Sequence, residues 1–198
     1  MKARIVRSAL TIATVLAPLG ALAGGQVIEQ VETYSINGES ARALYDSIGE
    51  RGPMLGNSRV IAQTGFKLTW RRDYQNRHGG CVLASAVPRL VITTKLPKPS
   101  ARLPADVAAR WAVFIEGVTA HEKVHAENIK VLAREIEKAT VGLSAENDPD
   151  CNRLRAKMQP ILKEISDQRR QKDRDFDKVE FGPGGTVQQL VIGLLGPG

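Results

Sequence analysis

The segment with the clearest chemical potential is His121-Glu122-Lys123-Val124-His125, a His-Glu-x-x-His motif. Histidines four residues apart lie on one face of a helix, so both imidazoles can bind the same metal ion. Glu122 lies about 100° around the helix from His121, where its carboxylate can reach a bound water rather than the metal. Zinc lowers the pKa of such a water, and the carboxylate can take its proton as the water attacks a carbonyl group. The motif therefore predicts a hydrolytic zinc site, for which a peptide bond is the usual substrate.

The motif also lies in a suitable helical context. The chain has only three histidines, and two of them belong to the motif. Helical periodicity predicts one long helix over residues 104–139, in which His121 and His125 continue an inward-facing apolar stripe. The alternative is a pair of core histidines bonded to buried carbonyl groups, with Glu122 as a surface charge. The other members of the stripe are Val107, Trp111, Phe114, Val118, Ile129, Leu132 and Ile136.

A catalytic zinc ion usually has three protein ligands, so the motif needs one more. A second helix is predicted over residues 152–175, and an antiparallel return along the first helix brings its end back to the motif. We therefore expect Asp177 to be the third ligand, with Glu180 as the second candidate and His78 as the third. Asn128 shares the face of the motif but suits a contact to a ligand better than a ligand itself.

The two cysteines, Cys81 and Cys151, are the only ones in the chain. An isolated pair in an exported protein usually forms one disulfide, which is the expected state here. The alternative is two buried free thiols. These two residues alone cannot build a transition-metal site.

The N-terminal segment, residues 1–23, is typical of a secretory signal peptide. It begins with basic residues and no acidic one, continues through an apolar stretch over residues 9–22, and ends on Ala21-Leu22-Ala23. No other long apolar run follows, so we expect no integral membrane segment in residues 24–198. The predicted location is periplasmic or secreted.

The charge of the chain is modest. Lys and Arg number 28 against 21 Asp and Glu, which gives a formal net charge of +7. The basic residues are dispersed, which argues against a dedicated nucleic-acid binder. The charge permits only a loose affinity for anionic surfaces.

The expected architecture is an α+β fold in which a small antiparallel sheet packs against two long antiparallel helices, the first being a zincin-like active-site helix. Residues 24–198 are expected to form one domain, sheet-rich over 26–96, helical over 104–177 and ending in a tail over 182–198. Pro160 is expected to kink or break the second helix, and the apolar tail is expected either to form a strand or to stay unpacked. The strands are predicted over residues 26–36, 59–74 and 81–96, with a hairpin loop over 75–80 and a short helix after Ser40.

An ordered set of residues extends across most of the chain: Tyr34, Gly38, Gly52-Pro53, Trp70, Cys81, Leu96-Pro97, Trp111, His121–His125, Cys151, Phe176-Asp177 and Gly182. This set resembles the bacterial "domain of unknown function 922" family of predicted secreted zinc-dependent proteases. The likeness covers about residues 30–185. It implies a periplasmic or secreted protein with a zincin-like metallopeptidase site, in which His121 and His125 bind the metal and Glu122 acts as general base.

The chain departs from the family pattern near its end. The family usually has a Thr and then a His just before the glycine, where this chain has Val179 and Phe181. If that His is a metal ligand in the family, this chain must supply a substitute or lack activity. The alternative functions are therefore a non-catalytic exported protein, binding metal or purely structural, and a weaker possibility of an envelope-binding module. Glu122 separates the peptidase from the non-catalytic alternative, because a peptidase needs this residue and a structural zinc site does not.

Overall fold

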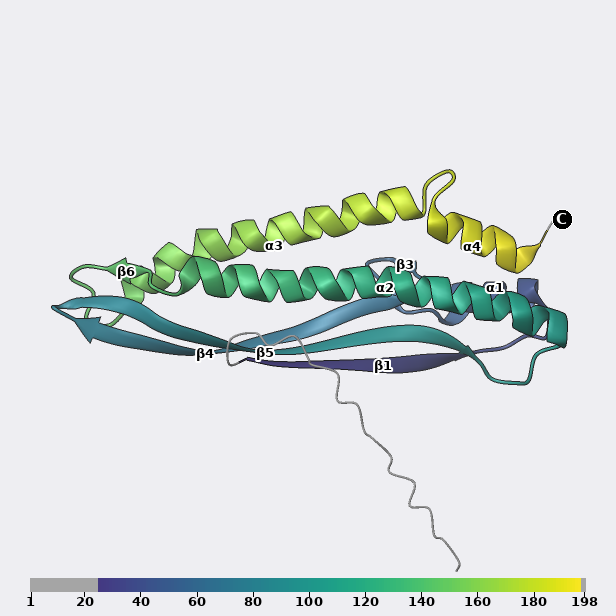
Figure 1. The fold of residues 1–198 in the computed structure, drawn as a ribbon, viewed down its shortest axis with the longest axis horizontal. Helices are drawn as coiled ribbons and strands as arrows, with labels where there is room; N and C mark the ends of the chain where they lie inside the picture. Colours follow the sequence, from purple (N-terminus) through teal and green to yellow (C-terminus); the bar gives the residue numbers. More distant parts are fainter. Residues whose placement is uncertain (1–24, 197–198) are drawn as a thin grey trace, which may run out of the picture.

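The computed structural model describes residues 25–196, which form a mixed α+β fold of four helices and a small sheet (Figure 1). The predicted signal peptide, residues 1–23, lies outside the described residues. The elements in chain order are β1 (Gln26–Ile36), α1 (Ala41–Arg51), β2 (Met54–Leu55), β3 (Ser58–Arg59), β4 (Gln63–Arg77), β5 (Gly80–Pro99), α2 (Ala105–Thr140), β6 (Ser144–Ala145), α3 (Asn152–Glu180) and α4 (Thr186–Leu195).

The sheet is built around β5, its longest strand, with the order β1-β5-β4. Strands β4 and β5 form an antiparallel hairpin whose turn consists of His78 and Gly79, with φ angles of 51° and 78°. Positive φ at both central residues is characteristic of the tightest hairpin turns. The predicted loop over residues 75–80 is therefore too long, because pairing continues to Arg77 and Gly80. The short strand β6 pairs with β5 beside this turn.

The expectation of an antiparallel sheet is wrong for β1, which pairs with β5 in parallel. Ile36 at the end of β1 pairs with Pro99, and Gln63 at the start of β4 pairs with Lys95. The chain thus leaves β1 and enters β4 at the same end of the sheet, with α1 and the β2–β3 hairpin between them. Strand β4 runs back, and β5 then runs in the direction of β1.

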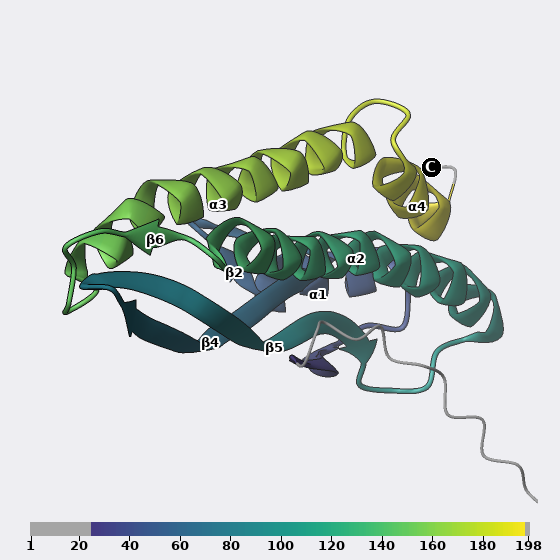
Figure 2. The same ribbon diagram turned by 60° about the vertical axis from the view of Figure 1, so that its left-hand side comes forward.

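Helix α2 lies between the sheet and α3, as both views show (Figures 1 and 2). Its buried stripe packs on β5 through Ile129 and Ala133, which meet Leu90 and Ile92. Near its start, Phe114 belongs to a larger core that α1, β1 and α4 also contribute to. Because both ends of α2 are packed in this way, its middle turns are held rigidly above the sheet.

The helix ends largely follow the local signals in the sequence. The Ser40 side chain accepts a hydrogen bond from the Ala43 N–H, which caps α1 as predicted. Helix α3 continues through Pro160 to Glu180 without a break, farther than the predicted end at residue 175. At its start, the buried Asp148 carboxylate accepts hydrogen bonds from the backbone N–H groups of Arg153 and Leu154, at 3.1 and 2.8 Å.

The tail expected to be a strand or unpacked is neither, since residues 186–195 form helix α4. Its side chains Val187 and Leu194 are buried, and Leu190 meets α2 at Gly117. A side chain at Gly117 would collide with Leu190, because a Cβ atom there would lie 2.3 Å from its nearest methyl carbon. The missing side chain therefore allows α4 to approach α2 closely.

The predicted disulfide between Cys81 and Cys151 is present, with the two Cα atoms 5.2 Å apart. It links the start of β5 to the start of α3 within a small core that includes Leu83, Leu154 and Met158. A disulfide fits an oxidising compartment such as the periplasm or the cell exterior. Among residues 25–196, no helix is both long and apolar enough to span a bilayer.

Candidate metal centre

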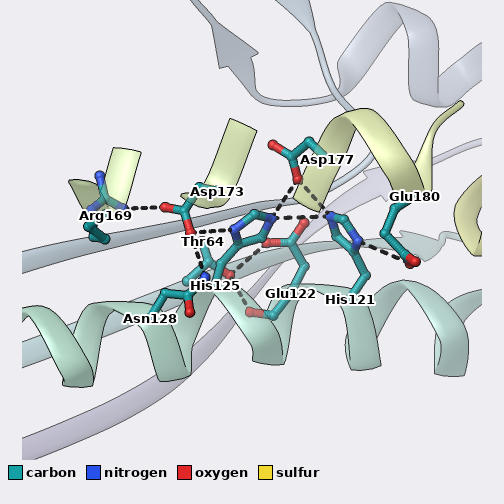
Figure 3. A network of polar contacts seen from close by, with 9 residues as sticks. All are labelled: Thr64, His121, Glu122, His125, Asn128, Arg169, Asp173, Asp177 and Glu180. Atoms are coloured by element: carbon teal, nitrogen blue, oxygen red, sulfur yellow. Dashed lines mark hydrogen bonds and ion pairs between the residues drawn. The ribbon is translucent and has the colours of Figure 1, made fainter. Parts of the chain in front are cut away.

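The His-Glu-x-x-His motif lies in the middle of α2, on the side that faces α3 and the start of β4 (Figure 3). His121 and Glu122 are buried, at 6% and 5% exposure, and the side chain of His125 is 13% exposed. The motif is thus on a packed helix face rather than on the surface. Glu122 is therefore not the exposed surface charge of the alternative interpretation.

Three potential ligand atoms meet between α2 and α3. His125 Nε2 lies 3.2 Å from His121 Nε2, and Asp177 Oδ1 lies 2.9 Å from His125 Nε2 and 3.3 Å from His121 Nε2. Asp177 belongs to α3, which runs back along α2 so that its last turns lie opposite the motif (Figure 3). These three residues form a group that could hold a metal ion.

The geometry of the group fits a small tetrahedral cation. Ligands about 2.0–2.1 Å from a tetrahedral zinc ion are roughly 3.3–3.4 Å from each other, close to the separations seen here. In addition, among residues 25–196, Asp177 Oδ1 is screened from solvent and accepts no hydrogen bond of good geometry, and His121 Nδ1 is likewise without a hydrogen-bond partner. Buried carboxylate oxygens in folded proteins are normally paired with a donor or an ion, and two imidazoles with one carboxylate are a suitable donor set for a metal ion.

Around these atoms, Asp173 connects His125 to two further residues. Its Oδ1 lies 3.3 Å from His125 Nδ1 and accepts a hydrogen bond from the Asn128 amide at 2.7 Å. Its Oδ2 accepts a hydrogen bond from Arg169 at 2.6 Å. A carboxylate on the far nitrogen of a metal-binding histidine fixes the orientation of the ring and its tautomer. Asp173 is thus positioned to hold His125 with Nε2 facing the other ligand atoms.

His121 is held mainly by aromatic rings. Phe176 stacks on its imidazole with ring centroids 4.8 Å apart, and Phe181 contacts it edge-on at 5.4 Å. Glu180 Oε2 lies 3.7 Å from His121 Nδ1, beyond a hydrogen bond, so this second candidate ligand lies beside the group and not in it. Of the two positions at which the chain departs from the family pattern, Phe181 packs on a histidine and Val179 is exposed.

The side chain of Glu122 is held in place by a residue of the sheet. The Thr64 hydroxyl, at the start of β4, donates a hydrogen bond to Glu122 Oε2 at 2.7 Å and lies 3.1 Å from the hydroxyl of Thr94 on β5. Burial raises the pKa of Glu122, and this effect outweighs the hydrogen bond from Thr64 and the charges of His121 and His125. A raised pKa brings a carboxylate nearer to the range in which it can both accept and return a proton.

The other charged groups of the centre influence one another strongly. Burial acts to lower the pKa of His125, but its contacts with Asp173 and Asp177 outweigh burial and raise the pKa to about 10. Burial acts in the opposite sense on the two aspartates, but their close contacts with the histidines outweigh burial, so the pKa of each carboxyl is lowered. Without metal, the centre is therefore a cationic histidine between two ionised aspartates.

His78, the third candidate ligand, lies far from Asp177 and Glu180, the other two candidates. It is in the β4–β5 turn, and the 14 residues of β4 and turn that separate it from Thr64 span roughly 46 Å at about 3.3 Å per residue. The loop cannot fold over the site because His78 is the first residue of a two-residue turn. This candidate is wrong.

A pocket of about 250 Å³ opens beside the group. Glu122 lines this pocket together with His121, His125 and Asp177, and Thr64 and Arg169 form part of its wall. The ligand atoms and the candidate general base therefore share one accessible space.

Sequence reasoning missed Thr64, Arg169 and Asp173. Arg169, Asp173 and Asp177 follow one another at four-residue intervals, which places them on one face of α3, so helical spacing from Asp177 could have identified the other two. Thr64 gave no such signal, because its role depends on the register of β4 beside α2.

The comparisons with known proteins place the chain in a family. No curated protein and no solved structure shows significant similarity to it. Residues 31–185 match the family described as "Bacterial protein of unknown function (DUF922)", and this range contains the His-Glu-x-x-His motif, Asp177 and both cysteines. Since the match extends over most of the chain, the protein belongs to the DUF922 family.

Proposed function

We propose that this protein is an exported zinc-dependent peptidase, with α2 as a zincin-like active-site helix. His121, His125 and Asp177 are the proposed zinc ligands, and Glu122 is the proposed general base. The observation that carries the proposal is that a buried carboxylate, fixed by Thr64, lines the same pocket as three potential metal ligands. A purely structural metal site has no need of such a carboxylate.

Zinc is the metal that best suits two imidazoles and one carboxylate in this geometry. When bound, it polarises the substrate carbonyl group and lowers the pKa of an adjacent water. The ligands lie on two helices: α2 is packed into the core near its start, and α3 is joined to a second core at its own start, beside the disulfide.

Glu122 carries the proton transfers in this proposal. The hydrogen bond from Thr64 engages Oε2, which leaves Oε1 to accept a proton from the attacking water. The water oxygen bonds to the carbonyl carbon, and the carbon–nitrogen bond then breaks as Glu122 returns the proton to the leaving amine. Asp173 and Arg169 keep His125 oriented throughout and do not contact the reacting atoms.

Export is proposed from two observations that point the same way. The N-terminal 23 residues have the pattern of a signal peptide, and the disulfide between Cys81 and Cys151 requires an oxidising environment to persist. The substrate is accordingly a peptide or protein outside the cytoplasm.

The test uses purified residues 24–198 with and without added zinc, and dye-quenched denatured casein as the substrate. The wild-type protein should bind about one zinc ion per chain and release fluorescence from casein. Glu122→Gln should retain zinc and lose activity by roughly 10²–10⁴-fold, the usual contribution of general acid–base catalysis. His125→Ala should lose zinc as well. Equal rates for the wild type and Glu122→Gln would contradict the assignment, and a zinc-loaded but inert wild type would support the non-catalytic alternative.

Thr64→Val gives an independent measure of the same assignment. It removes the hydroxyl that orients Glu122 while preserving the size of the side chain. We expect kcat to fall, because the carboxylate loses its fixed position, whereas zinc affinity should stay within about twofold because Thr64 contacts no ligand. A loss of zinc with unchanged kcat would contradict this role.

A further inference from the structure

A second pocket is lined by side chains of β4 and α3. The end of β4 and the start of α3 lie at the end of the molecule that holds the hairpin turn (Figures 1 and 2). The volume of the pocket is about 390 Å³. Its walls combine two guanidinium groups with aromatic and apolar side chains, and they include no acidic residue. The lining residues are Trp70, Arg72, Tyr74, Arg155, Met158, Gln159 and Leu162.

Arg72 lacks a counter-ion in this pocket. Its guanidinium carbon lies 5.6 Å from the centre of the Trp70 ring, and its Nε atom is screened from solvent with no hydrogen-bond acceptor among the residues that the structure describes. Within the described part of the chain, no carboxylate forms an ion pair with it. A donor that is screened from solvent and unsatisfied is costly, so the position favours an acceptor that protein atoms do not supply.

Arg155 contributes the second charge from the opposite wall. Its guanidinium lies 4.8 Å above the Tyr74 ring, and one of its terminal nitrogens donates to the Asp150 carbonyl at 2.9 Å and to the Asn152 side chain at 3.4 Å. These contacts hold the side chain in place, and none of them neutralises its charge. Two unneutralised arginines, each placed against an aromatic ring, make this pocket suited to an oxyanion.

The pocket is aligned with the metal centre along the same two elements. Thr64 at the centre and Arg72 in the pocket are both on β4, eight residues apart, which corresponds to roughly 27 Å. On α3, Asp173 and Arg155 are 18 residues apart, which also corresponds to roughly 27 Å. Between the two sites, β4 and α3 are bridged by Arg169, whose guanidinium lies 5.4 Å from the Phe66 ring.

We propose that the Arg72–Arg155 pocket binds a carboxylate of an acidic segment in the peptide substrate. This inference rests on the proposed peptidase function. An extended peptide rises about 3.3 Å per residue, so the acidic group is about eight residues from the bond that is cleaved. The apolar walls at Met158 and Leu162 accommodate the aliphatic part of a Glu side chain, and the two guanidinium groups bind its carboxylate.

The test measures binding directly, by calorimetric titration of residues 24–198 with acetylated tetraglutamate amide. Tetraglutamine amide is the neutral control peptide. We expect measurable binding of tetraglutamate that weakens as salt is raised. Arg72→Gln and Arg155→Gln should each weaken it by at least about tenfold, because each removes a charge-assisted contact. Arg71→Gln is the matched control, since Arg71 is exposed and alternates to the other face of β4.

The outcomes separate this proposal from the proposed function. Equal binding of the two peptides, or equal weakening by Arg71→Gln and Arg72→Gln, would overturn the pocket whether or not the protein hydrolyses casein. Binding of inorganic phosphate that depends on Arg72 and Arg155, without binding of tetraglutamate, would overturn the peptide assignment. Conversely, Arg72-dependent tetraglutamate binding by a protein that does not hydrolyse casein would support the pocket and contradict the peptidase.

Discussion

Replacing Asp173 with asparagine tests how the metal centre is supported. Asp173 does not belong to the proposed ligand set, but its carboxylate faces His125 Nδ1 and also accepts hydrogen bonds from Asn128 and Arg169. Asparagine preserves the shape of the side chain and removes its charge. We expect the histidine to lose its fixed orientation while all three proposed ligands remain.

The magnitude follows from these contacts. Loss of a carboxylate behind a metal-binding histidine typically lowers metal affinity by about 10–100-fold, or about 1.4–2.7 kcal/mol. The variant also leaves Arg169 without its carboxylate partner. This matters because the side chains of Arg169 and Asp173 are only 20% and 15% exposed. We expect this to cost about 1–3 kcal/mol of folding stability, between the values for exposed and fully buried ion pairs.

The assay is zinc affinity by competition with a chelator, together with urea unfolding of the metal-free protein. Affinity is compared at several pH values, because a proton on His125 competes with zinc. Asp167→Asn is the matched control, since Asp167 is an acidic residue of the same helix that pairs with Lys163 and Arg170 on the surface. This control should leave zinc affinity unchanged and alter stability by less than about 1 kcal/mol.

Two results would refute the reasoning. Zinc affinity of Asp173→Asn within twofold of the parent would mean that His125 is oriented by something other than Asp173. An equal loss in Asp173→Asn and Asp167→Asn would mean that the effect comes from the general charge of α3 and not from the contact with His125.

Three further predictions concern folding. Replacing both Cys81 and Cys151 with serine should lower the free energy of unfolding by about 4 kcal/mol on the chain-entropy model for a loop of this length, measured by urea denaturation; an unchanged midpoint would contradict it. Leu194→Ala should cost about 2–5 kcal/mol because the side chain is 1% exposed, whereas Ile192→Ala, at 51% exposed, should cost under about 1 kcal/mol. Burial acts to raise the pKa of Asp148, but the hydrogen bonds from backbone N–H groups outweigh burial and lower its pKa below 3.8. The contribution of this carboxylate to folding stability is therefore complete above about pH 4 and is lost as pH falls through the folded-state pKa. Asp148→Asn should accordingly flatten the acid limb of the unfolding profile.

Much of the fold could be predicted from local patterns. The first strand and the first helix follow from alternation and from the Ser40 cap, and the long helix follows from its apolar stripe. Local patterns could not predict that β1 runs parallel to β5, because this depends on the end of the sheet at which β4 begins. Helix α4 was missed because it is short, follows a glycine-rich turn and contains Gly193, so its local helix signal is weak, and its burial comes from contact with α2.

The residues of the site also differ in whether local sequence patterns could predict them. His121 and His125 are related by helical spacing alone, so the sequence is sufficient to predict that they meet. Asp177 required only the lengths of two helices and the assumption that the second returns along the first. Thr64 is contributed by a strand far away in the sequence, and no local pattern relates it to Glu122. Contacts of this kind depend on tertiary register and emerge only from the folded structure.

The distribution of burial along α3 has a consequence for its dynamics. Of its 29 residues, only Leu154 and Met158 are buried, and both are in the first turns, beside the disulfide. Its later turns are held against α2 largely through contacts of Asp173, Phe176 and Asp177 with the two histidines. Protection of amide hydrogens from exchange should therefore decrease along the helix after Met158. If the centre binds a metal ion, that ion would join Asp177 to α2 and increase protection in the later turns, so that its occupancy would control how often the space between α3 and β4 opens.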